Sequence, residues 1–148
     1  MDFAKTTTLC VALLFAVEAR AQFGPYLDLA DLDGRNAKLF MGELRYSGTG
    51  KDATVGDLNA DGYDDLIIAA PGWGDSSWWP PDDFPGTVYV VFGGPTFDAI
   101  VTMGMEELDG TNGFAIEGPQ PCGAFGTTVA SGFDWNGDGT DDLGPVNK

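Results

Sequence analysis

Two nine-residue segments of this chain carry a dense pattern of side-chain oxygens. Residues 57–65 read DLNADGYDD, and residues 134–142 read DWNGDGTDD. In both segments Asp, Asn and Asp occupy positions 1, 3 and 5, a Gly follows at position 6, and an Asp stands at position 9. The glycine allows a sharp reversal that turns alternating oxygen donors onto a common centre. The pattern therefore indicates a pair of cation-binding loops.

The donor set favours calcium. Position 7 can offer its backbone carbonyl whatever its side chain, so each loop supplies hard oxygens in the number that Ca²⁺ takes, at about 2.3–2.6 Å. The sequence contains no His, and the one cysteine outside the apolar N-terminal segment cannot build a zinc or copper site alone. We therefore expect two Ca²⁺ sites. The expected ligands are Asp57, Asn59, Asp61, Tyr63 and Asp65 in the first loop, and Asp134, Asn136, Asp138, Thr140 and Asp142 in the second.

An EF-hand and a pair of metal-free acidic turns both fit these segments less well. An EF-hand loop needs a bidentate Glu at position 12 and flanking helices, whereas position 12 is Ile68 in the first loop and Pro145 in the second, and the flanks look like strands. Solvated acidic turns are plausible for one copy, because Asp-Gly and Asn-Gly are good hairpin formers. Two copies, each of which packs four carboxylates that would repel one another without a cation, favour metal binding.

The overall charge agrees with a cation as the bound species. Among 148 residues, 7 Lys plus Arg face 23 Asp plus Glu, which gives a formal net charge of −16. Nucleic acids and anionic membrane surfaces are polyanions, so this balance argues against both as partners. The 22 Gly and 9 Pro favour short strands and turns over long helices.

The N-terminal segment is typical of a secretion signal. Residues 9–17 form an apolar run too short to span a bilayer, and Ala-Arg-Ala at 19–21 fits the small-x-small cleavage rule. We expect residues 1–21 to be removed and the mature chain to be secreted or extracellular; a buried core helix is the alternative. Cys10 would leave with this segment, so that Cys122 remains as a buried small residue or as half of a bridge.

The sequence repeats itself after about 76 residues. Leu-Asp-Gly at 32–34 recurs at 108–110, and the two acidic loops start 77 residues apart. Asn and Gly positions between these features keep nearly the same spacing, so chance similarity is a poor explanation. The repeat divides the chain into a signal segment, a lead-in, a first unit and a truncated second unit. These are residues 1–21, 22–34, 35–110 and 111–148.

The apolar patterns predict an all-β fold. Buried strands are expected at residues 66–69 and 87–92, and a third at 126–131 leads into the second loop. Residues 38–43 and 113–118 are shorter and suit edge strands. No stretch of a dozen residues outside the N-terminal segment has helical periodicity. Each repeat thus supplies about four short strands, the content of one small twisted sheet.

The combined motifs resemble FG-GAP repeats. Phe125-Gly126 precedes the second loop, and Ala-Ala-Pro at 69–71 follows the first. FG-GAP repeats are the blades of the seven-bladed β-propeller of integrin α subunits and of many secreted bacterial proteins, and the resemblance runs from about residue 35 to residue 143. It implies four-stranded antiparallel blades in which both acidic loops are β-hairpin calcium sites with the ligands named above.

The chain also departs from the family pattern. Ser47-Gly48 stands where the family has Phe-Gly, so the inner strand of the first copy is expected to be degenerate, and the second copy ends in DDLGPVNK without an LIIAAP strand. Two blades cannot close a ring. We interpret the chain as the N-terminal piece of a longer propeller, whose first strand, in AKLFMGE, would complete the last blade. A two-unit protein that oligomerises to cover its edges is the alternative.

The resemblance implies a calcium-stabilised extracellular scaffold for ligand binding or cell adhesion, and not an enzyme. The sequence lacks His, its Asp clusters are accounted for by metal, and its isolated glutamates suit the surface (Glu43, Glu106, Glu107 and Glu117). The alternative is the propeller portion of a secreted hydrolase or lyase whose catalytic residues lie outside this chain. A structural spacer without a specific ligand is a third interpretation.

Residues 71–86, PGWGDSSWWPPDDFPG, are the candidate ligand-binding segment. In the family's topology this connection lies on the face opposite the calcium loops, where integrin-like propellers meet their ligands. Aromatic rings on a proline-stiffened loop suit a protein or carbohydrate ligand, or they cover the edge of their own blade. The expected contact residues are Trp73, Trp78, Trp79 and Phe84.

Overall fold

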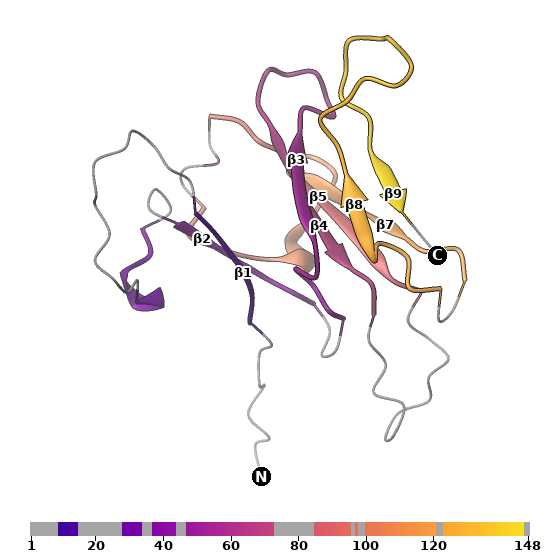
Figure 1. Cartoon of the computed structure of the whole chain (residues 1–148). Helices are drawn as coiled ribbons and strands as arrows, with labels where there is room; N and C mark the ends of the chain where they lie inside the picture. The colour runs from indigo at the N-terminus through magenta and orange to yellow at the C-terminus, as the bar shows by residue number, and fades with distance from the viewer. Residues whose placement is uncertain are drawn as a thin grey trace.

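A computed structural model describes residues 9–14, 28–33, 37–43, 47–72, 85–95, 97, 100–120 and 123–146. Within these ranges the protein is all-β, with short 3₁₀ turns and no α-helix, which confirms the predicted fold class (Figure 1). The strands are β1 (Leu9–Leu14), β2 (Ala37–Met41), β3 (Ala53–Gly56), β4 (Asp65–Ala70), β5 (Thr87–Val91), β6 (Thr102–Gly104), β7 (Gly113–Glu117), β8 (Thr128–Ala130) and β9 (Gly144–Val146). The 3₁₀ turns are η1 (Leu29–Asp31) and η3 (Met105–Glu107).

The central element is a four-stranded antiparallel sheet in the order β3-β4-β5-β7. Its registers are continuous: Gly56 lies opposite Asp65, Leu66 opposite Val91, and Val91 opposite Gly113. All six residues of β4 are buried, because both faces of this strand are covered. A continuous apolar run is what a strand buried on both faces requires. This sheet has the four antiparallel strands that the sequence predicts for a propeller blade.

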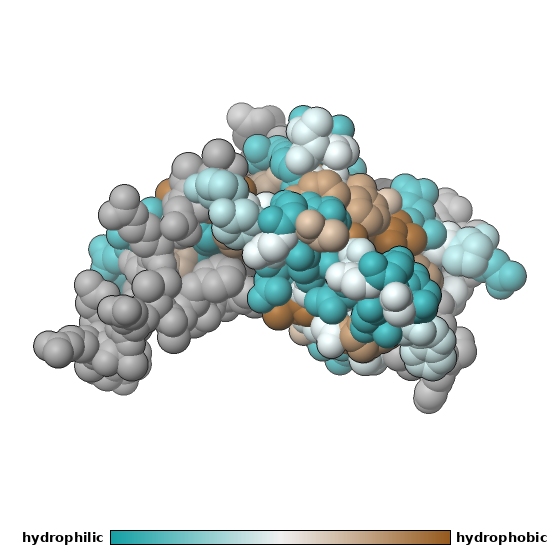
Figure 2. Space-filling model, turned by 90° about the horizontal axis from the view of Figure 1, so that it is seen from above, coloured by the Kyte–Doolittle hydropathy of each residue, from teal (hydrophilic) through white to brown (hydrophobic). Residues whose placement is uncertain are grey.

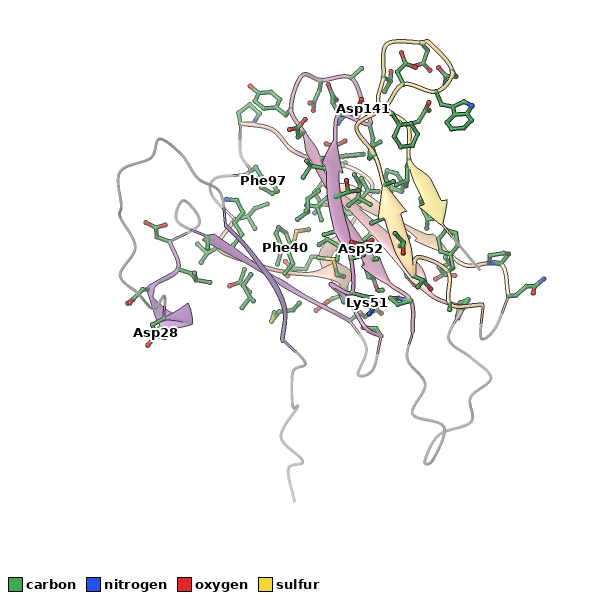
Figure 3. All side chains as sticks on the ribbon, viewed as in Figure 1. Asp28, Phe40, Lys51, Asp52, Phe97 and Asp141 are labelled. Atoms are coloured by element: carbon green, nitrogen blue, oxygen red, sulfur yellow. The ribbon has the colours of Figure 1, made fainter. Side chains whose placement is uncertain are left out.

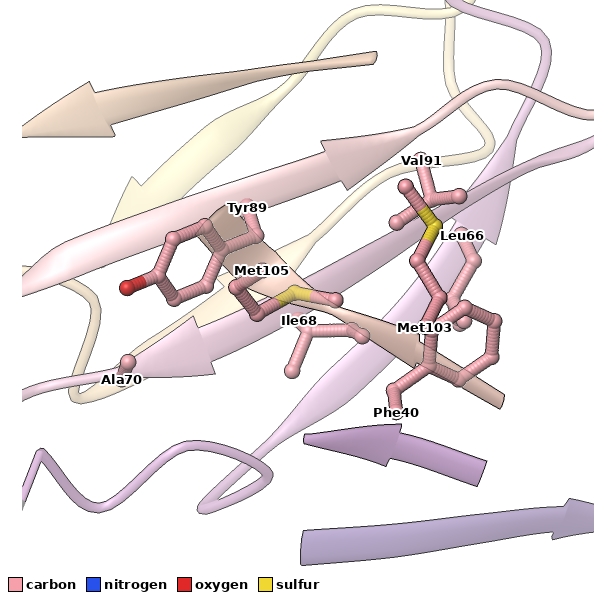
Figure 4. Close-up of a cluster of buried hydrophobic side chains, with 8 residues drawn as sticks. All are labelled: Phe40, Leu66, Ile68, Ala70, Tyr89, Val91, Met103 and Met105. Carbon is pink, nitrogen blue, oxygen red and sulfur yellow. The ribbon is translucent and has the colours of Figure 1, made fainter. Parts of the chain in front are cut away.

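Alternate side chains of the central sheet enter two different cores. On one face, Leu66, Ile68 and Tyr89 pack against Phe40 of β2 and against Met103 and Met105, as Figure 4 shows. The other face carries Ile67, Ala69, Val88 and Val90, which pack with Val129 of β8. The second repeat unit therefore covers one side of the first.

Two smaller sheets flank the central one. In the first, β2 lies between β1, to which it is antiparallel, and β6, to which it is parallel. Strand β1 lies within residues 1–21, the segment expected to be a secretion signal. The removal of this segment stays a prediction. In the second, β8 pairs with β9, which places a short strand after the second loop where the sequence pattern shows none.

Two further details differ from the sequence-based expectations. Strand β3 is a regular strand that pairs with β4 over four residues, although the Phe-Gly signature is missing before it. Backbone pairing with β4 does not depend on that signature. Strand β7 pairs with β5, so the central sheet extends beyond the repeat boundary placed at residue 110. The sequence repeat and the structural sheet are offset by one strand.

Candidate metal centre

Both acidic loops are the turns of β-hairpins. The first joins β3 to β4 and the second joins β8 to β9, and both lie at the same end of the molecule (Figure 1). The residue pair at the base is equivalent in the two copies: Gly56 lies opposite Asp65, and the amide N of Asp142 donates to the carbonyl O of Phe133 at 2.7 Å. Seen from above, this end of the molecule presents largely hydrophilic residues with hydrophobic ones between them (Figure 2).

In the first loop the side-chain oxygens at positions 1, 3 and 5 accept hydrogen bonds from the loop's own backbone. Asp57 Oδ1 accepts from the amide of Asp61 at 3.1 Å, and its Oδ2 accepts from the amide of Gly62 at 2.9 Å. Asn59 Oδ1 accepts from the amide of Asp61 at 3.0 Å, and Asp61 Oδ1 from that of Tyr63 at 2.9 Å. These side chains therefore point into the loop.

The second loop repeats this network at equivalent positions. Asp134 Oδ1 accepts from the amide of Asp138 at 3.1 Å, and Asp134 Oδ2 from the amide of Gly139 at 2.8 Å. Asn136 Oδ1 accepts from Asp138 at 2.8 Å, and Asp138 Oδ1 from Thr140 at 2.9 Å. Two loops that differ at positions 2, 4 and 7 thus adopt one conformation, which their shared Asp, Asn and Gly residues determine.

Each loop turns through two left-handed residues. Gly62 and Gly139 at position 6 have φ of +87° and +89°, as their role in the reversal requires. Position 4 is also left-handed, with φ of +58° at Ala60 and +77° at Gly137. The alanine carries a backbone strain there that a glycine avoids. The sequence-based expectation included only the reversal at position 6. The glycine at position 4 of the second loop, Gly137, is a sequence signal for the left-handed residue at position 4.

The aspartate at position 9 of each loop accepts hydrogen bonds from backbone amides near the start of the same loop. Asp65 is fully buried and accepts hydrogen bonds from the amides of Leu58 at 3.0 Å and Gly93 at 2.9 Å. In the second loop Asp142 Oδ2 accepts from the amides of Trp135 at 2.6 Å and Asn136 at 3.2 Å. Asp65 thereby connects the first loop to the end of β5, a contact that the sequence pattern does not reveal.

The electrostatic environments of the loop carboxyls differ with burial. Desolvation raises the pKa of Asp65 above its ordinary value, and the carboxylates of Asp61 and Asp57 add to this, while the amides of Gly93 and Leu58 oppose it. The exposed Asp138 has a lowered pKa, chiefly because the Thr140 amide donates to its carboxylate. Ionisation of Asp65 therefore costs more than that of an exposed aspartate, and a nearby cation would reduce this cost.

Each loop carries the oxygen donor types that a hard cation takes, but the structure does not bring them together around one point. All ten expected ligands lie in the described part of the chain, and each loop places one Asn and its Asp side chains around a short turn. Among the described residues, however, no group of three or more Asp, Glu, His or Cys side chains is already gathered closely enough to hold a metal. The carboxylate oxygens are oriented by backbone amides, and they would have to converge further to bind an ion.

The other predicted site falls outside the described residues. Trp73, Trp78, Trp79 and Phe84 all lie in the range 73–84, which the structure does not describe. The ends of this connection, at Ala70 of β4 and Thr87 of β5, lie opposite one another, at the end of the sheet away from Asp65. The connection therefore leaves the sheet opposite the acidic loops, as the family topology implies. The helical segments in the described part of the chain are short 3₁₀ turns, and none of them could span a bilayer.

Comparisons with known proteins agree with this architecture. Residues 49–91, which contain the whole first loop, β4 and β5, match the FG-GAP repeat family. The chain is 37% identical over 102 residues to phosphatidylinositol-glycan-specific phospholipase D of Bos taurus, and 31% identical over 121 residues to integrin alpha-5 of Xenopus laevis. These alignments cover 66% and 82% of this chain but only 11% and 10% of the relatives. The chain thus spans about a tenth of their length.

Proposed function

Because residues 49–91 form an FG-GAP repeat, we propose that this chain is part of a calcium-stabilised extracellular propeller that serves as a ligand-binding or adhesion scaffold. The observation that carries the calcium proposal is the shared conformation of the two acidic loops. Both point the side chains at positions 1, 3 and 5 inward, and both turn at left-handed residues in positions 4 and 6. Most residues of both loops are exposed, so this shared geometry comes from the loop residues themselves and not from core packing.

Calcium would act on stability in this proposal. The ion would be held by side-chain oxygens at positions 1, 3, 5 and 9 and by the carbonyl at position 7, and it would neutralise part of the loop's negative charge. In the first loop it would offset the desolvation and repulsion that raise the pKa of Asp65. Because Asp65 also holds Gly93 at the end of β5, binding at the loop would stabilise the central sheet.

The test is a thermal or urea unfolding experiment on the chain, with calcium and with chelator. Binding to the folded state alone stabilises it by about 2.7 kcal/mol when calcium is 100-fold above Kd, and Kd values near roughly 10⁻⁴–10⁻³ M are common in extracellular modules. Asp61→Ala and Asp138→Ala should each remove one of two bound ions. Asp64→Ala removes the same charge from an exposed position that is not an expected ligand, and it should keep both. Stability that is indifferent to chelator would refute the calcium proposal.

The proposed ligand contacts are on the connection between β4 and β5. Its described ends, Ala70 and Thr87, lie at the end of the sheet opposite the acidic loops, so a protein or carbohydrate bound there would leave those loops free to stabilise the blade. The double substitution Trp78→Ala, Trp79→Ala tests this assignment, with binding measured on glycan and extracellular-matrix protein arrays. Lost binding at unchanged stability supports it, whereas lost stability at unchanged binding shows that the rings cover their own blade.

A second candidate function is the propeller portion of a secreted hydrolase. Its support is the similarity to phosphatidylinositol-glycan-specific phospholipases D, 37% identical in Bos taurus and 36% in Homo sapiens. In that case the catalytic groups would lie outside this chain, since its sequence has no His and its acidic loops are assigned to metal. We expect this chain alone to cleave no phosphatidylinositol-glycan. Measurable cleavage would overturn the non-catalytic assignment.

A further inference from the structure

The two acidic loops are directly connected through one residue. Asp141, at position 8 of the second loop, accepts a hydrogen bond on Oδ2 from the amide N of Asp57 at 3.0 Å. Its own amide N donates to the carbonyl O of Asp57 at 3.1 Å. Asp141 therefore engages both backbone polar groups of the residue at position 1 of the first loop. Figure 3 shows Asp141 beside the upper end of β3.

The absence of a side chain at Gly56 allows the second repeat to approach the first this closely. A Cβ at Gly56, the last residue of β3, would collide with Ser131 Oγ and would lie 3.0 Å from Asp141 Oδ2. Near the start of β3, Asp52 Oδ2 accepts a hydrogen bond from the amide of Val129 at 3.1 Å. The second repeat is thus hydrogen-bonded to the first near both ends of β3, and Asp141 makes the contact nearest the first loop.

The equivalent residue of the first loop behaves differently. Asp64 also occupies position 8, but it is exposed, and within the described part of the chain no hydrogen bond of its carboxylate is found. The two residues share a type, a loop position and a charge. They differ in that only Asp141 contacts a neighbouring repeat, which makes Asp64 a matched control.

We propose that Asp141 is a positioning residue for the first metal site, supplied by the neighbouring repeat. Both carboxylate oxygens of Asp57 are oriented by amides of the first loop, and Asp141 fixes the backbone from which that carboxylate projects. The inference rests on the calcium function proposed above. By linkage, an ion in the first loop would in turn strengthen the docking of the second repeat.

The test compares the two sites when Asp141 is changed. Isothermal titration with calcium is run on the whole chain in two backgrounds, Asp138→Ala, which leaves the first site, and Asp61→Ala, which leaves the second. Asp141→Ala should weaken the first site about five- to tenfold, the equivalent of one ordinary hydrogen bond, and weaken the second site less, although Asp141 belongs to the second loop. Asp141→Asn keeps an acceptor oxygen for the Asp57 amide, so it should restore most of the first-site affinity. Asp64→Ala measures the effect of charge alone.

The outcomes separate the two proposals. If the unsubstituted chain binds no calcium, the proposed function itself fails. If it binds two ions but Asp141→Ala weakens the first site no more than Asp64→Ala does, or weakens both sites equally, the positioning role is refuted. Folding is checked by far-ultraviolet circular dichroism. Should Asp141→Ala not fold, Asp141→Glu, which shifts the carboxylate by one methylene, provides the same comparison.

Discussion

Replacing Asp65 by Asn separates the structural role of this residue from its proposed role as a ligand. The carboxylate accepts two backbone hydrogen bonds, from Leu58 and Gly93. Asn has one acceptor oxygen, so its amide group must face a backbone donor, and losing a hydrogen bond to a charged acceptor costs about 1.5–3 kcal/mol. Asn also removes the buried charge whose cost is seen in the raised pKa of Asp65. In chelator these effects oppose each other, and we expect a net loss of about 1–2 kcal/mol.

Calcium should enlarge this loss. If Asp65 is a ligand, the variant also forfeits the linkage term, about 2.7 kcal/mol at 100-fold excess over Kd. The free energy of unfolding is measured by urea titration, followed by tryptophan fluorescence, for both proteins with calcium and with chelator. The difference between the two conditions isolates the ligand role. An equal loss in both conditions would show that Asp65 only supports the hairpin.

Substitutions at three further positions, Gly139, Ile68 and Tyr89, test the fold. Gly139→Ala should destabilise the metal-free chain by about 1–2 kcal/mol through its left-handed φ alone, because nothing lies within 4 Å of the added Cβ; an unchanged melting temperature would refute this. Ile68→Ala, at a fully buried position, should cost about 2–5 kcal/mol, against less than about 0.5 kcal/mol for a conservative change at the exposed Val55, Val55→Thr; equal losses in urea unfolding would contradict the two-sided core. Burial raises the pKa of Tyr89 above 10.0, so its contribution to stability is complete below that value and is lost as pH rises through the raised pKa. Tyr89→Phe should therefore reduce the alkaline loss of stability above pH 10, and an unchanged alkaline unfolding profile would contradict this.

Much of the fold was predictable because the signals are local. The apolar run of β4 and the β-branched run of β5 identify buried strands, and the Asp, Asn and Gly positions identify the hairpin turns, since these residues hydrogen-bond to their own backbone. Strands β3 and β9 were not predictable in this way. Each is short, and each owes its regular conformation to pairing with a partner strand rather than to its own residue types.

Burial of polar side chains was equally invisible in the sequence. Lys38 lies in a segment expected to form an edge strand, yet it is almost fully buried. Its Nζ donates to the carbonyl O atoms of Phe97 at 2.7 Å and Ile100 at 3.3 Å, and it lies 4.7 Å from the centre of the Phe97 ring. These carbonyl groups, about 60 residues away in the sequence, satisfy the buried ammonium group. No local sequence pattern predicts such a contact.

The sequence by itself determined the two loops, the positions of their oxygen-bearing side chains and their repeat relationship, because each loop is a nine-residue unit that orders itself through its own amides. Only the tertiary structure decided how the loops relate to each other and to the sheet. Asp141 and Asp57 are separated by 84 residues and meet because β8 packs beside β3 and β4. Asp65 and Gly93 are separated by 28 residues and meet because β4 pairs with β5. Position 8 reads Asp in both loops, and packing alone makes one of them a bridge and leaves the other in solvent.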